Sequence, residues 1–238
     1  MDPSDADAFA LLAVAMHDEP TVEQTLDAVL ASAVRALACE HAGVMFAHGR
    51  EPAETVATTS PQVEEIDRLE ADLGDGPGLG TLGGGRSVLV ADTATDARWP
   101  RWSSAVAGLG VRSLLAVPLS TRLTAVGTLA CYDQRPGRFD EDDLATAEVF
   151  ARHAAAALAA ARNLENLWVA VDARNTVGQA QGLLMERFRL SPDRALAVLL
   201  RYSRDTDTKL REVAEGVVAS HLLRVTEPAR EQPPHATA

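Results

Sequence analysis

The sequence predicts an α+β domain, with an antiparallel sheet flanked by helices, joined by a long helix to an all-α unit of three helices. Three observations lead to this fold class. Short β-like runs separated by glycine and proline fill residues 41–133. Residues 140–187 contain no proline and carry apolar side chains at helical spacing. Two further amphipathic segments follow, and with the end of the long run they can form a compact helical unit.

Length and composition fit one sizeable domain plus a small one. The chain has 238 residues, of which 47 % are hydrophobic, and its two cysteines are Cys39 and Cys131. Two cysteines can build neither a disulfide framework nor a metal cluster, so we expect a reducing, cytoplasmic location. The acidic start shows no signal peptide. The longest apolar run near the long helix, residues 154–161, is too short to span a membrane.

Charge is distributed unevenly along the chain. Residues 1–167 carry 12 basic and 25 acidic side chains, whereas residues 168–226 carry 9 basic and 7 acidic ones. An acidic surface repels polyanions. Any contact with nucleic acid is therefore expected from the C-terminal segment.

Two helices are expected before the sheet. Ser4 is a candidate cap for the first, and Thr21 with Gln24 has capping-box spacing at the start of the second. Both can cover a sheet, and the first can instead lie along the long helix. The strands that follow are expected at residues 42–47, 55–59, 88–91, 113–118 and 124–132. Helices are expected at residues 63–73 and 99–109, and the breaker-rich residues 74–78 predict an irregular loop.

Several motifs in this region carry a family resemblance. They are Gly-Asp-Gly-Pro-Gly at 74–78, Val-Leu-Val-Ala-Asp at 88–92, Asp-Ala-Arg-Trp-Pro at 96–100, Gly-Val-Arg-Ser-Leu-Leu-Ala-Val-Pro-Leu at 110–119, Gly-Thr-Leu-Ala-Cys-Tyr at 127–132 and Phe-Asp-Glu-Asp-Asp at 139–143. In this order they resemble a GAF domain over about residues 20–165. The resemblance implies a six-stranded sheet with a ligand-sized cavity on one side. We expect a GAF sensor domain, including its N-terminal helices, over residues 1–165.

The resemblance supplies no ligand. Many related domains have a cysteine after the Gly-Pro pair, where this chain has Gly78, so no thiol or covalent chromophore is expected there. Trp99, Trp102 and Cys131 are candidate pocket residues, although residues of these types in such positions are more often part of the core. The domain either senses a small molecule or an upstream signalling protein, or is a degenerate GAF domain that serves only as a dimer scaffold.

Residues 140–187 predict one continuous helix shared by both domains. Asp140 is a suitable N-cap, followed by acidic residues in the first turn. Such a helix extends roughly 70 Å, more than a domain of this size can bury alone. We therefore expect a homodimer in which the helix pairs with its copy. The expected dimer stripe is Leu144, Ala147, Ala151, Ala154, Leu158, Ala161, Leu164 and Trp168. The alternative is two ordinary helices joined near Asn163 or Asp172.

No catalytic or metal-binding constellation is visible. The serines, carboxylates and six histidines fall in no nucleophile–base or metal-ligand spacing. The triple glycine at residues 83–85 is followed by Arg-Ser, which excludes a phosphate-binding loop of the Gly-Lys-Ser/Thr type. We expect a protein that is not an enzyme and holds no metal.

The C-terminal segment carries a second resemblance. Its blocks are Val-Gly-Gln-Ala-Gln-Gly-Leu-Leu-Met at 177–185, Leu-Leu-Arg-Tyr-Ser at 199–203 after Ala195, and Lys-Leu-Arg-Glu-Val-Ala at 209–214. They are similar to the ANTAR family of RNA-binding antiterminator domains, expected here over residues 168–222. The resemblance implies binding to paired stem-loops in nascent transcripts, which prevents a terminator hairpin from forming. The family usually has a lysine where this chain has Gln181, so one phosphate contact is missing or replaced.

The residues themselves agree with RNA binding. Lys209 is the only lysine in the chain and precedes a helix, and arginines of the same segment can share one electropositive face with it. Ser203 is either a donor to a loop base or a helix cap. The candidate RNA-contact residues are Lys209, Arg201, Arg204, Ser203, Arg211, Gln179 and Gln181. Gly178 and Gly182, one turn apart, are expected to let a neighbouring helix approach closely.

The sequence therefore predicts a homodimeric regulator whose sensor domain controls an effector that engages two RNA hairpins. Two rival interpretations stay open. One is a DNA-binding regulator, against which the absence of a basic recognition helix counts. The other is a signalling scaffold that binds no nucleic acid. The polar, proline-rich residues 227–238 are expected to be disordered.

Overall fold

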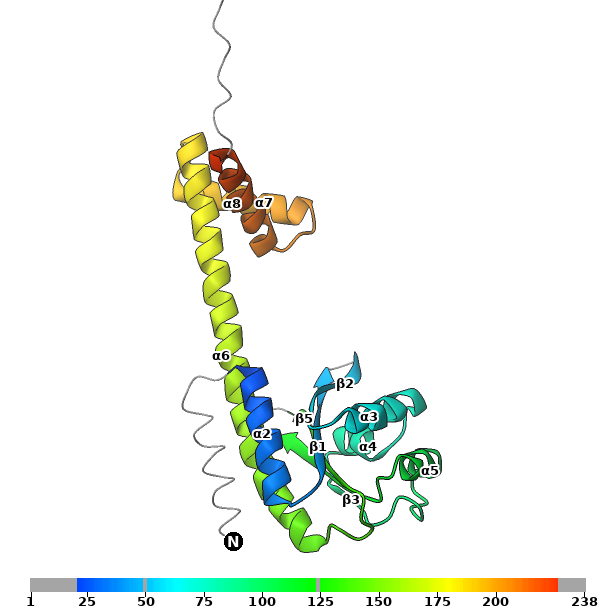
Figure 1. The fold of residues 1–238 in the computed structure, drawn as a ribbon. Coiled ribbons are helices and arrows are strands. Elements are labelled where there is room, and N and C mark those ends of the chain that lie inside the picture. Colours follow the sequence, from blue (N-terminus) through cyan, green and yellow to red (C-terminus); the bar gives the residue numbers. More distant parts are fainter. Residues whose placement is uncertain (1–20, 49–50, 123–124, 227–238) are drawn as a thin grey trace, which may run out of the picture. The chain divides into compact units, whose positions relative to one another are not determined.

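A computed structural model describes residues 21–48, 51–122 and 125–226 (Figure 1). The helix expected after Ser4 and the tail expected from residue 227 lie outside the described residues. The chain divides into two compact units, of which one ends at Glu165 and the other begins at Asn166. No helix within the described ranges combines the length and the apolar character that crossing a membrane requires.

An antiparallel five-stranded sheet is the centre of the N-terminal unit. In spatial order its strands are β2 (Glu51–Thr58), β1 (His41–His48), β5 (Ala125–Asp133), β4 (Ser113–Ser120) and β3 (Val88–Val90). The antiparallel α+β fold is confirmed, but the described residues form five strands where the family resemblance implied six. Directly after β3 the chain turns, and the Asp92 carbonyl accepts hydrogen bonds from the backbone N–H groups of Thr95 and Asp96.

Helices cover both faces of this sheet (Figure 1). One face carries α2 (Val22–Ala36) and the first part of α6 (Glu141–Phe188). The opposite face carries α3 (Pro61–Leu73), α4 (Pro77–Gly84) and α5 (Pro100–Gly108). Because successive strand residues point to opposite faces, β4 and β5 each contribute to two separate apolar cores.

Local signals set the helix ends. The predicted capping box of Thr21 and Gln24 begins α2, and Gly74 ends α3 in the left-handed conformation with φ 65°. The loop expected at residues 74–78 is shorter than predicted, because α4 already begins at Pro77. Proline suits the first helical position, and the N–H of Leu79 in the same turn donates to the carboxylate of Glu70.

Helix α6 is continuous over 48 residues, so the predicted single helix is confirmed and neither Asn163 nor Asp172 interrupts it. At its start the Asp140 carboxylate accepts hydrogen bonds from the N–H groups of Asp142 and Asp143, both at 2.9 Å. These bonds satisfy donors that a helix leaves free at its N-terminus.

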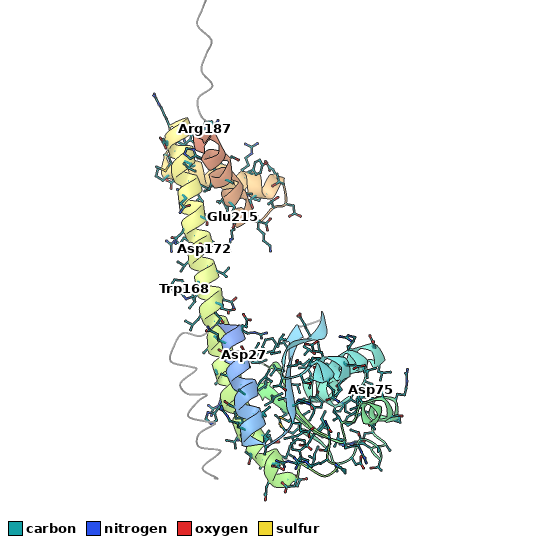
Figure 2. All side chains as sticks on the ribbon, viewed as in Figure 1. Asp27, Asp75, Trp168, Asp172, Arg187 and Glu215 are labelled. Atoms are coloured by element: carbon teal, nitrogen blue, oxygen red, sulfur yellow. The ribbon has the colours of Figure 1, made fainter. Side chains whose placement is uncertain are left out.

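The expected dimer stripe on α6 separates into two parts. Its first part packs inside the N-terminal unit, so the expectation that these side chains face a second subunit is wrong. Ala147, Ala151, Ala154, Leu158 and Ala161 are at most 3 % exposed, and Leu144 packs against the same core. Small alanines let the helix lie close to the sheet and to α2. Leu164 and Trp168 remain 36 % and 64 % exposed, and Figure 2 marks Trp168 in the middle of α6.

The C-terminal unit is built from the end of α6, α7 (Pro192–Asp205) and α8 (Leu210–Thr226). Among the residues whose burial the structure describes, its buried apolar core is small and consists of Ala180, Leu199, Val213 and Ala214. Gly178 and Gly182 do not serve the close packing expected of them within this chain. Apart from the backbone of α6 itself, a Cβ atom at either glycine would meet no atom of the described residues within 4 Å.

Candidate effector pocket and nucleic-acid interface

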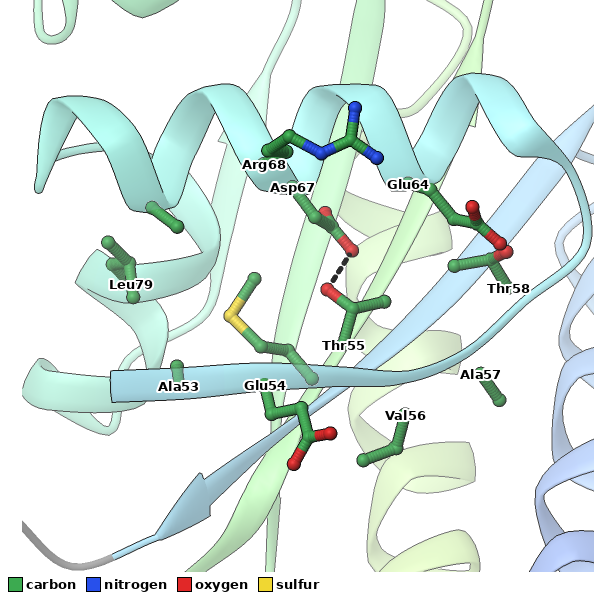
Figure 3. Close-up of a pocket in the computed structure, with 12 residues that line it drawn as sticks. Ala53, Glu54, Thr55, Val56, Ala57, Thr58, Glu64, Asp67, Arg68 and Leu79 are labelled. Atoms are coloured by element: carbon green, nitrogen blue, oxygen red, sulfur yellow. Dashed lines mark hydrogen bonds between the residues drawn. The ribbon is translucent and has the colours of Figure 1, made fainter. Parts of the chain in front are cut away.

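A pocket of about 620 Å³ opens between the edge strand β2 and helix α3 (Figure 3). Met45 of β1 and Leu79 of α4 supply apolar lining. Carboxylates of Glu54, Glu64 and Asp67 line it together with one cation, Arg68. The volume lies within the usual range for small-molecule sites. The excess of carboxylates favours a ligand that is cationic or donates hydrogen bonds.

Asp67 is the buried polar group of this pocket. Its side chain is 5 % exposed and accepts hydrogen bonds from the Thr55 hydroxyl at 2.7 Å and from the Tyr132 hydroxyl at 3.0 Å. Figure 3 shows the bond from Thr55, which ties β2 to α3 across the pocket. Burial raises the pKa of the Asp67 carboxyl, and the two hydrogen bonds oppose that rise. The Asp67 carboxylate retains acceptor capacity for a ligand that donates a hydrogen bond.

Glu70 lies one turn further along α3 and is 1 % exposed. One carboxylate oxygen accepts a hydrogen bond from the N–H of Leu79, and the other has no protein partner among the described residues. Burial, and then the charge of Asp67, raises the pKa of Glu70 to about 7. Helix α3 thus contains, one turn beyond the pocket residue Asp67, a buried carboxyl group whose charge changes near neutral pH.

The glycines of the breaker-rich segment make room for Glu70. A Cβ atom at Gly76 would lie 2.6 Å from Cδ of Glu70, so the Glu70 side chain would have to move. At Gly78, the position of the cysteine in many related domains, a Cβ atom would lie 3.2 Å from both carboxylate oxygens. A side chain at either position would therefore press on the buried acid.

The three candidate pocket residues suggested by the sequence do not line the β2–α3 pocket. Trp102 is buried in the core between the sheet and α3 and α5, together with Tyr132, and its indole N–H has no partner within the described part of the chain. Cys131 is buried on the opposite face, under α2 and α6. There the hydrogen bond with Cys39, followed by burial, raises the pKa of the Cys131 thiol. Trp99 stands at the start of α5, with the guanidinium of Arg98 over its ring.

Asp67 and Glu70 were missed, although the sequence held a signal for them. Val63 and Ile66 define the inward face of α3, and both acids lie at helical spacing on that face. Acidic residues on an apolar stripe indicate a buried polar function rather than a solvated surface.

In the C-terminal unit, Lys209 directly precedes α8, and its carbonyl accepts the first helical hydrogen bond from Val213. The side chains of Lys209, Arg201 and Arg204 are exposed. Arg201 makes one ion pair, with Asp205 at 3.4 Å, in which the two side chains are 82 % and 65 % exposed. Such an exposed pair contributes little stability and opens readily. Cations next to a helix N-terminus, where N–H groups are unpaired, suit a phosphate.

Three other candidate RNA contacts have structural partners within the unit. The Ser203 hydroxyl donates to the Thr208 carbonyl at 2.7 Å and links the end of α7 to the start of α8. The Gln181 amide donates to the Pro192 carbonyl at 2.8 Å. Arg211 bridges Asp172 on α6 and Glu215 on α8, both marked in Figure 2, at 2.9 and 2.7 Å. Gln179, by contrast, is exposed.

The same unit has an apolar groove of about 700 Å³ between its three helices. Phe188, Val198 and Tyr202 line it and are 57 %, 47 % and 59 % exposed. Exposed aromatic rings beside cations provide surfaces on which unpaired bases can stack.

Comparison with known proteins identifies two family domains in the chain. The GAF domain model matches residues 21–158, and the ANTAR domain model matches residues 165–218. A search of curated proteins finds no match.

Solved structures match the N-terminal fold. The GAF domain of a phosphoenolpyruvate-protein phosphotransferase from Acinetobacter is 15 % identical with TM-score 0.53, and covers 70 % of this chain and 99 % of its own. A free methionine-R-sulfoxide reductase from Neisseria meningitidis is 18 % identical with TM-score 0.51, covering 68 % and 95 %. The phycoerythrobilin-bound GAF domain of a cyanobacterial phytochrome is 14 % identical with TM-score 0.54, covering 68 % and 97 %. At these identities the likeness concerns the fold alone. The chain belongs to the GAF family and carries an ANTAR domain after its GAF domain.

Proposed function

We propose that this protein is a transcription antitermination regulator, in which the GAF domain controls an ANTAR domain that binds tandem stem-loops in nascent RNA. The observation that carries the proposal is the ANTAR match over residues 165–218, directly after the GAF match. The net positive charge of this segment is small. It suits RNA binding through a few specific phosphate contacts rather than through a broad positive surface.

The proposed RNA surface is the end of α7 with the start of α8. Lys209 and Arg204 would contact phosphates, and Arg201 would do so after releasing Asp205. Tyr202 offers a ring for an unpaired loop base. We assign Arg211 and Gln181 to holding the three helices together, because their side chains already bond within the unit.

Dimerisation is proposed along the part of α6 that the chain leaves exposed. Leu164, Trp168 and Val171 are 36–64 % exposed and spaced by four and three residues, which is the spacing of a coiled-coil seam. The same spacing continues through Asn175, Gly178 and Gly182. An asparagine in such a seam favours a dimer in register, and glycines with open space beside them let a partner helix approach closely.

In this scheme, an effector in the β2–α3 pocket changes how the two α6 helices pair, and so the availability of the two ANTAR domains. A ligand can shift that equilibrium only by its difference in affinity for the two arrangements. Two domains held together would bind two linked hairpins more tightly than one.

Gel-shift assays with a two-hairpin RNA test the contact surface. The Lys209→Ala/Arg201→Ala double variant should bind at least about tenfold more weakly than wild type, because two charge-assisted contacts are lost. An Arg194→Ala variant, altered at an exposed cation at the start of α7, is the matched control and should bind like wild type. If the double variant bound the RNA as tightly as wild type, this surface would be ruled out. If duplex DNA displaced the bound hairpin RNA as effectively as unlabelled RNA does, a DNA-binding regulator would be favoured.

A further inference from the structure

A second hollow in the GAF domain, of about 600 Å³, shares no residue with the β2–α3 pocket. Its walls come from three segments that are distant in the sequence. These are residues 85–87 before β3, residues 118–122 at the end of β4, and the first turns of α6. Each segment contributes one arginine: Arg86, Arg122 and Arg152.

These three arginines differ from the paired arginines of the same domain. All three side chains are exposed, and none forms an ion pair within the part of the chain that the structure describes. Four other arginines of the domain each bind an aspartate at 2.5–3.2 Å: Arg98, Arg112, Arg135 and Arg138.

The hollow is cationic on an acidic domain. Its one carboxylate, Glu148, accepts a hydrogen bond from the Ser87 hydroxyl at 2.6 Å. Three guanidinium groups and one carboxylate leave two positive charges, although residues 1–167 carry 25 acidic against 12 basic side chains. Cations gathered around one hollow repel one another and raise the local concentration of anions.

We propose that this arginine hollow, defined by Arg86, Arg122 and Arg152, binds a small phosphate monoester of nucleotide size. Guanidinium forks match phosphate oxygens in pairs. A phosphate monoester carries a charge of about −2 near neutral pH, which balances the hollow. The volume suits a ligand of that size. Pro118 and Leu144 add apolar surface against which the remainder of the ligand can lie.

The position of the hollow gives such a ligand a direct contact with α6. Arg152 and Glu148 belong to that helix, on the turns next to the buried Ala151 and Phe150. The phosphate would therefore join α6 to the ends of β3 and β4, independently of any effector in the β2–α3 pocket.

Isothermal titration calorimetry on the full-length protein at low salt tests the proposal without RNA. The probes are AMP, GMP, inorganic phosphate and adenosine. At least one of the two nucleotides should bind at one site per chain, at least about 100-fold more tightly than adenosine, because adenosine lacks the phosphate. The Arg86→Gln/Arg152→Gln double variant should bind that nucleotide at least about tenfold more weakly.

Two control variants show whether a bound nucleotide occupies the arginine hollow. The Arg35→Gln/Arg101→Gln variant removes two exposed arginines that do not line the hollow and should bind like wild type. Thr55→Val, altered in the β2–α3 pocket, should also keep nucleotide binding. Circular dichroism checks that each variant is folded, and Arg122→Gln repeats the test if the double variant is not. Absence of binding by AMP, GMP and phosphate, unchanged binding by the arginine variants, or loss of binding in Thr55→Val would overturn the proposal.

Discussion

The GAF and ANTAR domains differ in where their charged candidate binding groups lie, buried in the first and exposed in the second. In the GAF domain the carboxylates of Asp67 and Glu70 are buried beside a pocket. In the ANTAR domain the cations Lys209, Arg201 and Arg204 are exposed, and the interior is apolar and small. Buried polar groups suit a ligand that a domain can enclose, whereas exposed cations suit a partner larger than the domain.

This difference also concerns the single helix that both domains share. In the GAF domain the apolar side chains of α6 are buried by other parts of the same chain, and Leu158, for example, is 0 % exposed. Further along, Trp168 keeps 64 % of its surface exposed. One helix therefore contains a part that needs no partner and a part whose apolar surface a second subunit can cover.

The largest expected effect is on the small ANTAR core. Leu199→Ala should cost about 2–5 kcal/mol, as much as a core of this size supplies, so the ANTAR domain should unfold while the GAF domain stays folded. Leu158→Ala removes a similar side chain from the larger GAF core and should leave that domain folded but less stable. Hydrogen exchange of each domain measures both outcomes. If Leu199→Ala removed protection from both domains together, the two cores would not be independent.

The next effect concerns the buried acid of the GAF domain. The pKa of Glu70 rises from 4.5 to about 7 on folding, so the folded state holds this proton more tightly than the unfolded state. The free energy of unfolding should fall as pH rises from about 4.5 to 7, by up to about 3 kcal/mol from this group. Glu70→Gln should remove that part of the decline.

Urea unfolding at pH 5 and pH 8 measures this difference. Glu64→Gln is the matched control, because Glu64 is an exposed carboxylate on the same helix. It should keep the decline seen in wild type. An identical decline in Glu70→Gln and wild type would show that Glu70 does not titrate differently in the folded protein.

A smaller effect is expected on self-association. Trp168→Ala should raise the dimer dissociation constant at least about tenfold, because it removes a large exposed ring from the proposed seam. Folding of each chain should be nearly unchanged. Val149→Ala, altered at a residue 38 % exposed in the first part of α6, should dimerise like wild type. Sedimentation velocity over a concentration series decides, and a wild type that is monomeric throughout would contradict the proposed seam.

The smallest effect belongs to one surface cation. Lys209→Gln should leave the free energy of unfolding within about 0.5 kcal/mol of wild type. It should lower by about 1 the magnitude of the salt slope, which is the slope of the logarithm of the RNA-binding constant against the logarithm of the salt concentration, because one phosphate contact is lost. Fluorescence anisotropy with labelled hairpin RNA between low and high salt measures the slope. Arg194→Gln should keep the wild-type slope, and a slope unchanged in Lys209→Gln would remove Lys209 from the RNA surface.

Periodicity and capping predicted the elements that local sequence controls. The expected limits of α6, residues 140–187, differ by one residue from Glu141–Phe188, because Asp140 caps the start and no proline interrupts the run. The short helix α4 was missed because its support is not local. Its first turn is stabilised by Glu70 on α3, which the glycines at 76 and 78 allow to approach.

Side-chain placement was less predictable, since it depends on strand register and on pairing across elements. Neighbours on β5 face opposite cores, so Cys131 and Trp102 could not share a pocket, and only the register of β5 reveals this. Arg211 resembled a free cation in the sequence, but its ion pair with Asp172 spans 39 residues. Lys209 lies directly before α8, as predicted, because that position is a local feature, and its contact with RNA stays a prediction.

The affinity of the full-length protein for two linked hairpins, relative to one of those hairpins alone, tests the central claim most directly. If two ANTAR domains are joined through α6, wild type should bind the two-hairpin RNA at least about 100-fold more tightly than one hairpin. Trp168→Ala should reduce that ratio towards a factor of about 2, which two independent sites would give. Equal affinity of wild type for both RNAs, or no binding to either, would contradict the account.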